Sequence, residues 1–151
     1  MGVLYNIVQH AHSGLRWVVL ILLVAAIVNA FIKRRGGSVY PGRDGLALWA
    51  FISTHIQLVL GLLLWLWLSP YALGSAADDI MTNKIVRFYT VEHFTGMIIA
   101  IALITIGYIR AKKQADLNKG WKTIGIFYLI GLVIILASIP WPGRGLQGGW
   151  Y

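Results

Sequence analysis

The chain has 151 residues, of which 58% are hydrophobic and 12% are charged, and its formal net charge at pH 7 is +8. Soluble domains are usually about 45–50% apolar and about 25% charged, so most of this apolar surface is expected to face lipid. The chain has no cysteine, which excludes disulfides, thiolate metal sites, iron–sulfur clusters and covalent c-type haem attachment. The composition therefore predicts an integral membrane protein, with the lipid bilayer as its first partner.

Four apolar runs follow one another along the chain, and each is close to the ~20 residues that a helix needs to cross a bilayer. We place the spans at about 6–32, 46–69, 87–109 and 121–139. Backbone groups cannot stay unpaired in lipid, so these runs predict helices, and Pro70 and Pro140 stand where the second and fourth should end. Because the connections are short, the expected fold is an all-α, up-down bundle of four transmembrane helices that forms a single domain.

The positive charges gather around two of the connections and set the expected orientation. Nine of the thirteen Lys and Arg residues lie there, namely Lys33, Arg34, Arg35, Arg43, Arg110, Lys112, Lys113, Lys119 and Lys122. Such clusters favour the cytoplasmic side, so both termini are expected on the outer, periplasmic side of a bacterial inner membrane. The same placement, between apolar runs, argues against nucleic acid as the partner of this basic chain.

Ionisable residues inside the spans are costly in lipid and are therefore the candidate functional residues. Three histidines come from three different spans, namely His12, His55 and His93, whereas we interpret His10 as a surface residue. A neutral imidazole is a good ligand for haem iron, zinc or copper. A single histidine in a core is often only hydrogen-bonded to a carbonyl or hydroxyl group, but three on neighbouring helices favour a shared site.

Arg16 and Glu92 are the other two candidates among the ionisable residues of the spans. At about 1.5 Å per residue they come to nearly the same depth, close to the outer edge of the bilayer. We expect an ion pair between them, or two side chains that reach the interface. Alternatively, Arg16 binds a ligand carboxylate such as a haem propionate, since its planar fork suits bidentate contact and it shares a helix face with His12.

Small residues follow His93 along one stripe of the third span, at Gly96, Ala100 and Gly107. Such a stripe allows close helix packing, and it would equally make room for a flat macrocycle. Zinc and copper sites more often add carboxylate, Cys or Met ligands, so a haem iron held by two histidines fits these residues better. We therefore take Arg16, Gly96 and Ala100 as candidate cofactor-binding residues.

Several segments resemble a family of small four-span proteins of Bacteroidetes-type bacteria that is labelled "cytochrome B". They are HAHSGLRWVVLILL, FISTHIQLVLGLLLW, FYTVEHFTGMIIAIALITIGY and the terminal IPWPG, and together with their surroundings they cover most of the chain. The resemblance implies haem b held by transmembrane histidines, and electron transport in the membrane. It carries over to His12 in HSGLRW, His55 in THIQL and His93 in VEH.

The two axial nitrogens on one haem lie only about 4 Å apart, so the two ligands need similar depths. His55–His93 is the preferred pair, because it keeps the haem inside the hydrocarbon and leaves Arg16 for the propionates. His12–His93 is a close second. One haem b is expected, and a second is left open because three histidines leave one unpaired. The expected function is that of an electron carrier, with a quinone or a redox protein as its partner, rather than an enzyme with its own substrate.

Two other functions stay open. The histidines would form a transient site in a metal- or haem-handling assembly factor, or they would simply pack in an accessory subunit of a larger membrane complex. Homo-oligomer formation is open as well. No nucleophile–base arrangement or phosphate-binding loop is visible, so hydrolase and kinase chemistry have no support.

Overall fold

The computed structural model describes residues 2–73, 80–114 and 118–146, and the fold below refers to these residues. They include four helices that are long and apolar enough to cross a membrane, as predicted. The elements are α1 (Gly2–Arg35), α2 (Gly45–Leu63) with the π-helical turn η1 (Leu64–Leu68), α3 (Lys84–Arg87) with the π-helical turn η3 (Phe88–Glu92), α4 (His93–Lys112) and α5 (Lys119–Ser138). Their ends differ from the predicted spans by about one helical turn or less.

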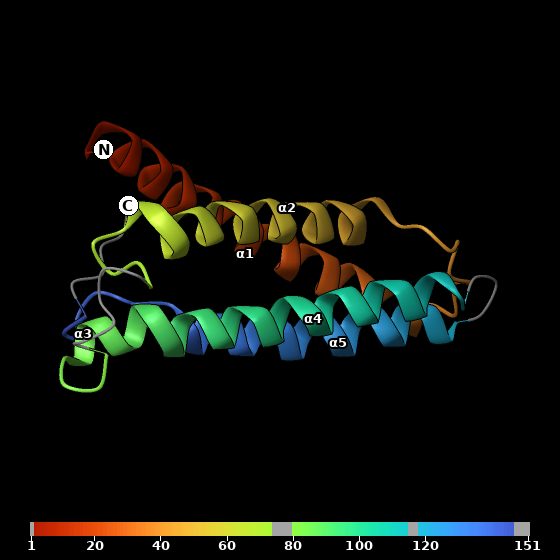
Figure 1. The fold of residues 1–151 in the computed structure, drawn as a ribbon. Coiled ribbons are helices and arrows are strands. Elements are labelled where there is room, and N and C mark those ends of the chain that lie inside the picture. The colour runs from red at the N-terminus through yellow and green to blue at the C-terminus, as the bar shows by residue number, and fades with distance from the viewer. Residues whose placement is uncertain (1, 74–79, 115–117, 147–151) are drawn as a thin grey trace.

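The helices run alternately up and down, so that the start of α1 and the end of α5 lie at the same end of the bundle (Figure 1). α1 packs against both α2 and α5, and α4 packs against α5, whereas α2 and α4 contact each other only lightly. The order around the bundle is therefore α2, α1, α5 and α4. Within it, α1 runs obliquely from the side of α2 at one end to the side of α5 at the other (Figure 1).

Local sequence signals explain where the helices begin and end. The Asp44 carboxylate accepts from the Ala47 backbone N–H at 3.0 Å and so caps the start of α2. Extended conformation returns at Ser69 and at Ile139, each directly before a proline. The residue ahead of a proline disfavours the α region, so both stops agree with the sequence.

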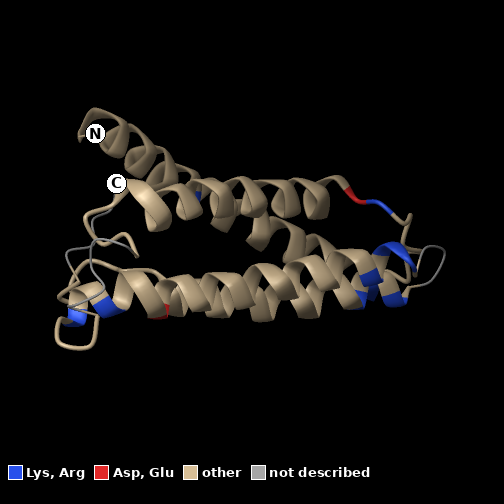
Figure 2. Cartoon of the chain, in the orientation of Figure 1, with Lys and Arg blue, Asp and Glu red and all other residues tan. Residues whose placement is uncertain are grey.

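Most of the Lys and Arg residues lie at one end of the bundle, around the connections 36–44 and 113–118, which we call the basic end (Figure 2). Aromatic packing holds this end together. Tyr40 is buried there, and its ring meets that of Trp121 edge-on with 4.9 Å between centroids. Gly120 lies against the Tyr40 ring, because a Cβ on Gly120 would lie 2.5 Å from the nearest carbon atoms of that ring. The two predicted basic segments thus meet in space, because the up-down topology places their connections at the same end.

Candidate functional site: a cavity lined by histidines

A cavity of about 300 Å³ lies between α1, α2 and α4. Its walls come from the first half of α1, the second half of α2 with η1, and the region where η3 joins α4. Ile135 and Ile139 add a wall from the end of α5, so the cavity lies toward the end of the bundle away from the basic end. The lining residues that matter below are His12, Arg16, Gln57, Gly61, Trp65 and His93. Concave, mostly apolar walls with a few polar groups are typical of a small-molecule site.

His12 of α1 and His93 of α4 meet in this cavity, although their helices are not neighbours in the order around the bundle. Their ring centroids are 6.4 Å apart, and the ring planes are inclined at 72°. Both side chains are only partly buried, since each borders the cavity. The structure thus brings together the pair that the sequence placed second.

The end of α5 orients the His93 ring. His93 Nδ1 lies 2.8 Å from the Ser138 carbonyl oxygen, and because a carbonyl can only accept, Nδ1 carries the proton and donates it. This carbonyl belongs to the last turn of α5, where helix carbonyls lack intrahelical donors. Nε2 is then the unprotonated nitrogen, whose lone pair is directed away from this bond. A ring nitrogen bonded to a backbone carbonyl is the usual arrangement in histidines that bind metals.

His12 is held through its backbone rather than through its ring. Its carbonyl oxygen accepts from Gln57 Nε2 at 2.8 Å, which joins α1 to α2 beside the cavity. Its buried Nδ1 has no hydrogen-bond partner among the residues that the structure describes, and leaving such a group unsatisfied costs about 1–3 kcal/mol. Gly61 makes room for the ring, because a Cβ there would lie 3.1 Å from His12 Cε1. A buried imidazole nitrogen of this kind beside a cavity favours a ligand-binding role over a purely structural one.

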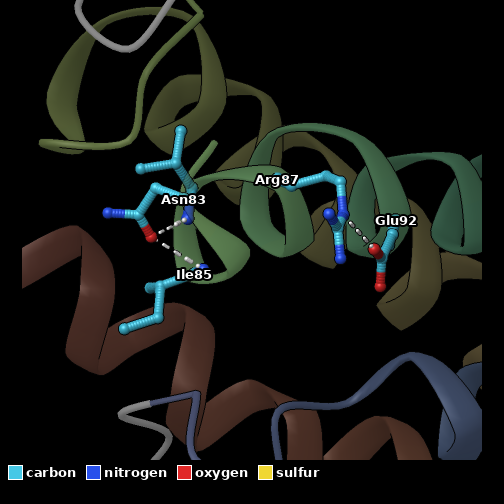
Figure 3. Close-up of polar contacts among 5 residues, drawn as sticks. Asn83, Ile85, Arg87 and Glu92 are labelled. Atoms are coloured by element: carbon cyan, nitrogen blue, oxygen red, sulfur yellow. Dashed lines mark hydrogen bonds and ion pairs between the residues drawn. The ribbon is translucent and has the colours of Figure 1, made fainter. Parts of the chain in front are cut away.

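Arg16 lies one helical turn after His12 and lines the same cavity, with its guanidinium carbon 5.4 Å from the ring centroid of Trp17. Glu92 does not pair with it as expected. It pairs with Arg87 at 3.0 Å, with both side chains substantially exposed (Figure 3). The π-helical turn η3 explains this difference, because its wider repeat brings residues five apart to the same side of the helix. Figure 3 also shows Asn83, whose side-chain oxygen accepts from the Ile85 N–H at 2.9 Å where α3 begins.

His55 lies away from the cavity. Its Nδ1 donates to the Phe51 carbonyl of its own helix at 2.7 Å, and its Nε2 lies 3.3 Å from Thr105 Oγ1 on α4. The ring packs on that of Phe51 with centroids 4.2 Å apart. Gln57 faces the cavity instead, and residues two apart in a helix point to nearly opposite sides. The preferred pair, His55 and His93, is therefore not brought together, and His55 has the contacts of a structural histidine.

The small residues of α4 pack against α5 and are not part of the cavity lining. A Cβ on Gly96 would overlap Ser138 Oγ, and one on Gly107 would overlap the Phe127 side chain. Ala100 is fully buried, and its carbonyl oxygen would lie 3.3 Å from a Cβ on Gly131. The stripe thus serves close helix packing, so the assignment of Gly96 and Ala100 as cofactor-binding residues gives way to this structural role.

Three cavity residues, Gln57, Gly61 and Trp65, are not singled out by the sequence analysis. Trp65 Nε1 donates to the Thr90 carbonyl at 2.8 Å, and its ring stacks on that of Phe94 with centroids 4.0 Å apart. Trp65 therefore joins η1 to η3 and α4, and so adds to the light contact between α2 and α4. Gln57 could have been found, because a polar amide in an apolar span needs partners inside the protein. Nothing in the sequence distinguishes Gly61 or Trp65 from the other Gly and Trp residues of the spans.

Over residues 2–73, 80–114 and 118–146, no three His, Cys, Asp or Glu side chains come close enough to hold a metal ion by themselves. Two imidazoles beside an apolar cavity suit a metal that brings further ligands of its own, and in donor chemistry they fit haem. No protein-family model, curated protein or solved structure matches the chain. The fold and the cavity together describe a multi-pass membrane protein with a paired-histidine site.

Proposed function

We propose that the protein is a b-type cytochrome that carries electrons in a bacterial inner membrane, with the haem iron held by His12 and His93. The separation of the two rings carries this proposal. Two imidazoles bound through one nitrogen each, at about 2 Å on opposite sides of a metal ion, have ring centroids about 6 Å apart. Those of His12 and His93 are 6.4 Å apart. The resemblance to the "cytochrome B" family supports the same cofactor.

The residues around the pair have separate roles in this proposal. The Ser138 carbonyl keeps His93 in the tautomer whose Nε2 can bind iron. Arg16, one turn from His12 on the cavity wall, would bind the haem carboxylates. Aromatic walls such as the Trp65–Phe94 stack would keep water from the site, which influences the reduction potential. Haem b supplies reversible one-electron transfer when it is bound.

The position of the cavity suggests where electrons are exchanged. With the basic end on the cytoplasmic side, the cavity falls toward the periplasmic face, together with the start of α1 and the end of α5. A single haem there would exchange electrons with a periplasmic redox protein or with a quinone in the outer leaflet. It would not by itself carry electrons across the ~30 Å hydrocarbon core.

Absorption spectroscopy of the full-length protein, purified in detergent from cells supplied with haem, tests this proposal. We expect a Soret band and, after reduction with dithionite, the narrow α band of a six-coordinate b-type haem. The absence of both bands would contradict the proposal. Metal analysis of the same sample is the control, because zinc or copper without iron would favour the metal-handling function instead.

A further inference from the structure

Side chains donate hydrogen bonds to four consecutive backbone carbonyls at the end of α5, from Leu136 to Ile139. Trp141 Nε1 donates to the Leu136 carbonyl and His93 Nδ1 to the Ser138 carbonyl, both at 2.8 Å. Arg144 Nη1 donates to the Ala137 carbonyl at 2.8 Å and to the Ile139 carbonyl at 2.9 Å. The last four carbonyls of a helix lack intrahelical partners, so these bonds determine how the end of α5 is held. The residues after α5 therefore belong to the surroundings of His93.

Arg144 donates to both of the carbonyls that flank the one bound by His93, and the Ile139 carbonyl also accepts from the Trp141 N–H at 2.9 Å. Because each peptide unit is planar, orienting the carbonyls of Ala137 and Ile139 also restricts the direction of the Ser138 carbonyl between them. The positive guanidinium is in addition well placed at the C-terminal end of a helix, where the helix dipole favours a cation. Arg144 is thus bonded on both sides of the acceptor that orients the His93 ring.

Arg144 also reaches the other side of His93. Its guanidinium carbon lies 5.5 Å from the ring centroid of the buried Phe88, and the Phe88 ring is 6.1 Å from the His93 ring. Tyr89 reinforces this connection, because its hydroxyl donates to the Leu146 carbonyl at 2.9 Å. The residues after α5 are therefore joined both to α5 and to η3, the two segments between which His93 is held.

We propose that Arg144 is a positioning residue for His93. It orients the Ser138 carbonyl, and through this acceptor it sets the tautomer and the direction of the His93 imidazole. Without Arg144, the Ala137 carbonyl loses its side-chain donor and the Ile139 carbonyl keeps only the Trp141 N–H. The Ser138 carbonyl is then less restricted in direction, and His93 populates both neutral tautomers. The consequence for haem rests on the proposed function, whereas the effect on the imidazole is expected in the haem-free protein as well.

Nitrogen-15 NMR of the histidine side chains in the haem-free, full-length protein tests this proposal. In the unmodified chain, His93 should show the pair of shifts of a single tautomer with the proton on Nδ1. In Arg144→Gln, these two shifts should move toward each other, as expected for a mixture of tautomers. His55 should keep its shifts, because its Nδ1 bond lies within α2. Arg87→Gln is the matched control, since it removes a cation that pairs on the exposed surface with Glu92.

Unchanged His93 shifts in Arg144→Gln would overturn the proposal, whether or not the protein binds haem. In haem-loaded protein, the same variant should show a larger high-spin fraction than the unmodified chain, and an equal fraction would count against the proposal. If the unmodified chain bound no haem, the proposed function would fail and the NMR comparison would still decide the role of Arg144. Loss of the His55 signals in Arg144→Gln as well would mean that this variant is not folded. Arg144→Met, which keeps an apolar stem and donates no hydrogen bond, would then replace it. Changed His93 shifts in Arg144→Met would support the proposal, and unchanged shifts would overturn it.

Discussion

His12 and His93 lie with their ring centroids 6.4 Å apart in a cavity at one end of the bundle. Their environments differ, because His93 Nδ1 is bonded to the Ser138 carbonyl whereas His12 Nδ1 has no hydrogen-bond partner in the described part of the chain. His93 is therefore the more rigidly held of the two proposed ligands. The position of the His12 ring depends more on the space around it, and Gly61 provides that space.

Gly61→Ala should weaken haem binding without unfolding the protein. A Cβ at this position would lie 3.1 Å from His12 Cε1 and 3.7 Å from His12 Nδ1, so the ring has to move. We expect the affinity for haem to fall by about tenfold, which corresponds to about 1.4 kcal/mol. Titration of haem into the haem-free variant, followed at the Soret band, measures this loss.

Gly14→Ala is the matched control, because a Cβ on this helical glycine would meet nothing within 4 Å. It should leave the haem affinity unchanged and stabilise α1 slightly, by up to about 1 kcal/mol, since alanine is the better helix former. Equal haem affinities for Gly61→Ala and Gly14→Ala would show that Gly61 does not limit the position of His12.

Gly96→Ala should reduce the stability of the bundle. Its new methyl group would overlap Ser138 Oγ and lie 3.0 Å from Ser138 Cβ, so the serine hydroxyl has to turn away and the close contact between α4 and α5 has to give. Overpacking of this kind typically costs about 1–3 kcal/mol, which unfolding in mixed micelles with increasing SDS can measure. The same change should disturb the bond from His93 to Ser138 and lower haem occupancy. If Gly96→Ala were as stable as Gly14→Ala, the small residues of α4 would have to serve another purpose.

Because of Tyr40, the free energy of unfolding should fall as the pH rises in the alkaline range. Burial raises the pKa of its hydroxyl from 10.0 to about 12, with smaller contributions from Tyr108 and Asp44. The unfolded chain therefore loses this proton at a lower pH than the folded chain does. The stabilisation is complete below pH 10, and it is lost as the pH rises through the folded value of about 12.

Tyr40→Phe should remove this dependence. Since the Tyr40 hydroxyl has no hydrogen-bond partner within residues 2–73, 80–114 and 118–146, the variant should be at least as stable as the unmodified chain at pH 7. Between pH 10 and pH 12 it should lose less stability, because it lacks the hydroxyl whose pKa differs between the folded and the unfolded chain. Parallel stability curves over this range would contradict the burial of a neutral phenol at position 40.

The helices and their ends could be predicted because length, hydropathy, proline positions and clustered charges act locally along the chain. The pairing of the histidines could not, because helices with apolar residues on all sides do not indicate which face is turned inward. His55 and Gln57 illustrate this, since they lie two residues apart and only Gln57 lines the cavity. Counting about 1.5 Å of depth per residue along upright helices also places His12 and His93 at different depths. In the structure α1 runs obliquely through the bundle, so depth along an upright helix does not describe the position of His12 (Figure 1).

The pairing of Glu92 illustrates a second limit. Arg16 and Glu92 were expected to meet because they have similar depths, but the π-helical turn η3 places Glu92 beside Arg87 instead. A local change in helical repeat of this kind leaves no clear signal in an apolar sequence. The small-residue stripe of α4 was compatible with helix packing and with a cofactor, and only the position of α5 decides between them.

The haem-to-protein ratio of three single variants, measured as the pyridine haemochrome of purified protein, tests the central claim most directly. His12→Ala and His93→Ala should each lose most of the haem, because each removes one of the two side chains that would hold it. His55→Ala should keep it, because His55 lies outside the cavity and bonds to Phe51 and Thr105. Loss of haem from His55→Ala together with full retention in His12→Ala would contradict this account and favour the pair His55–His93.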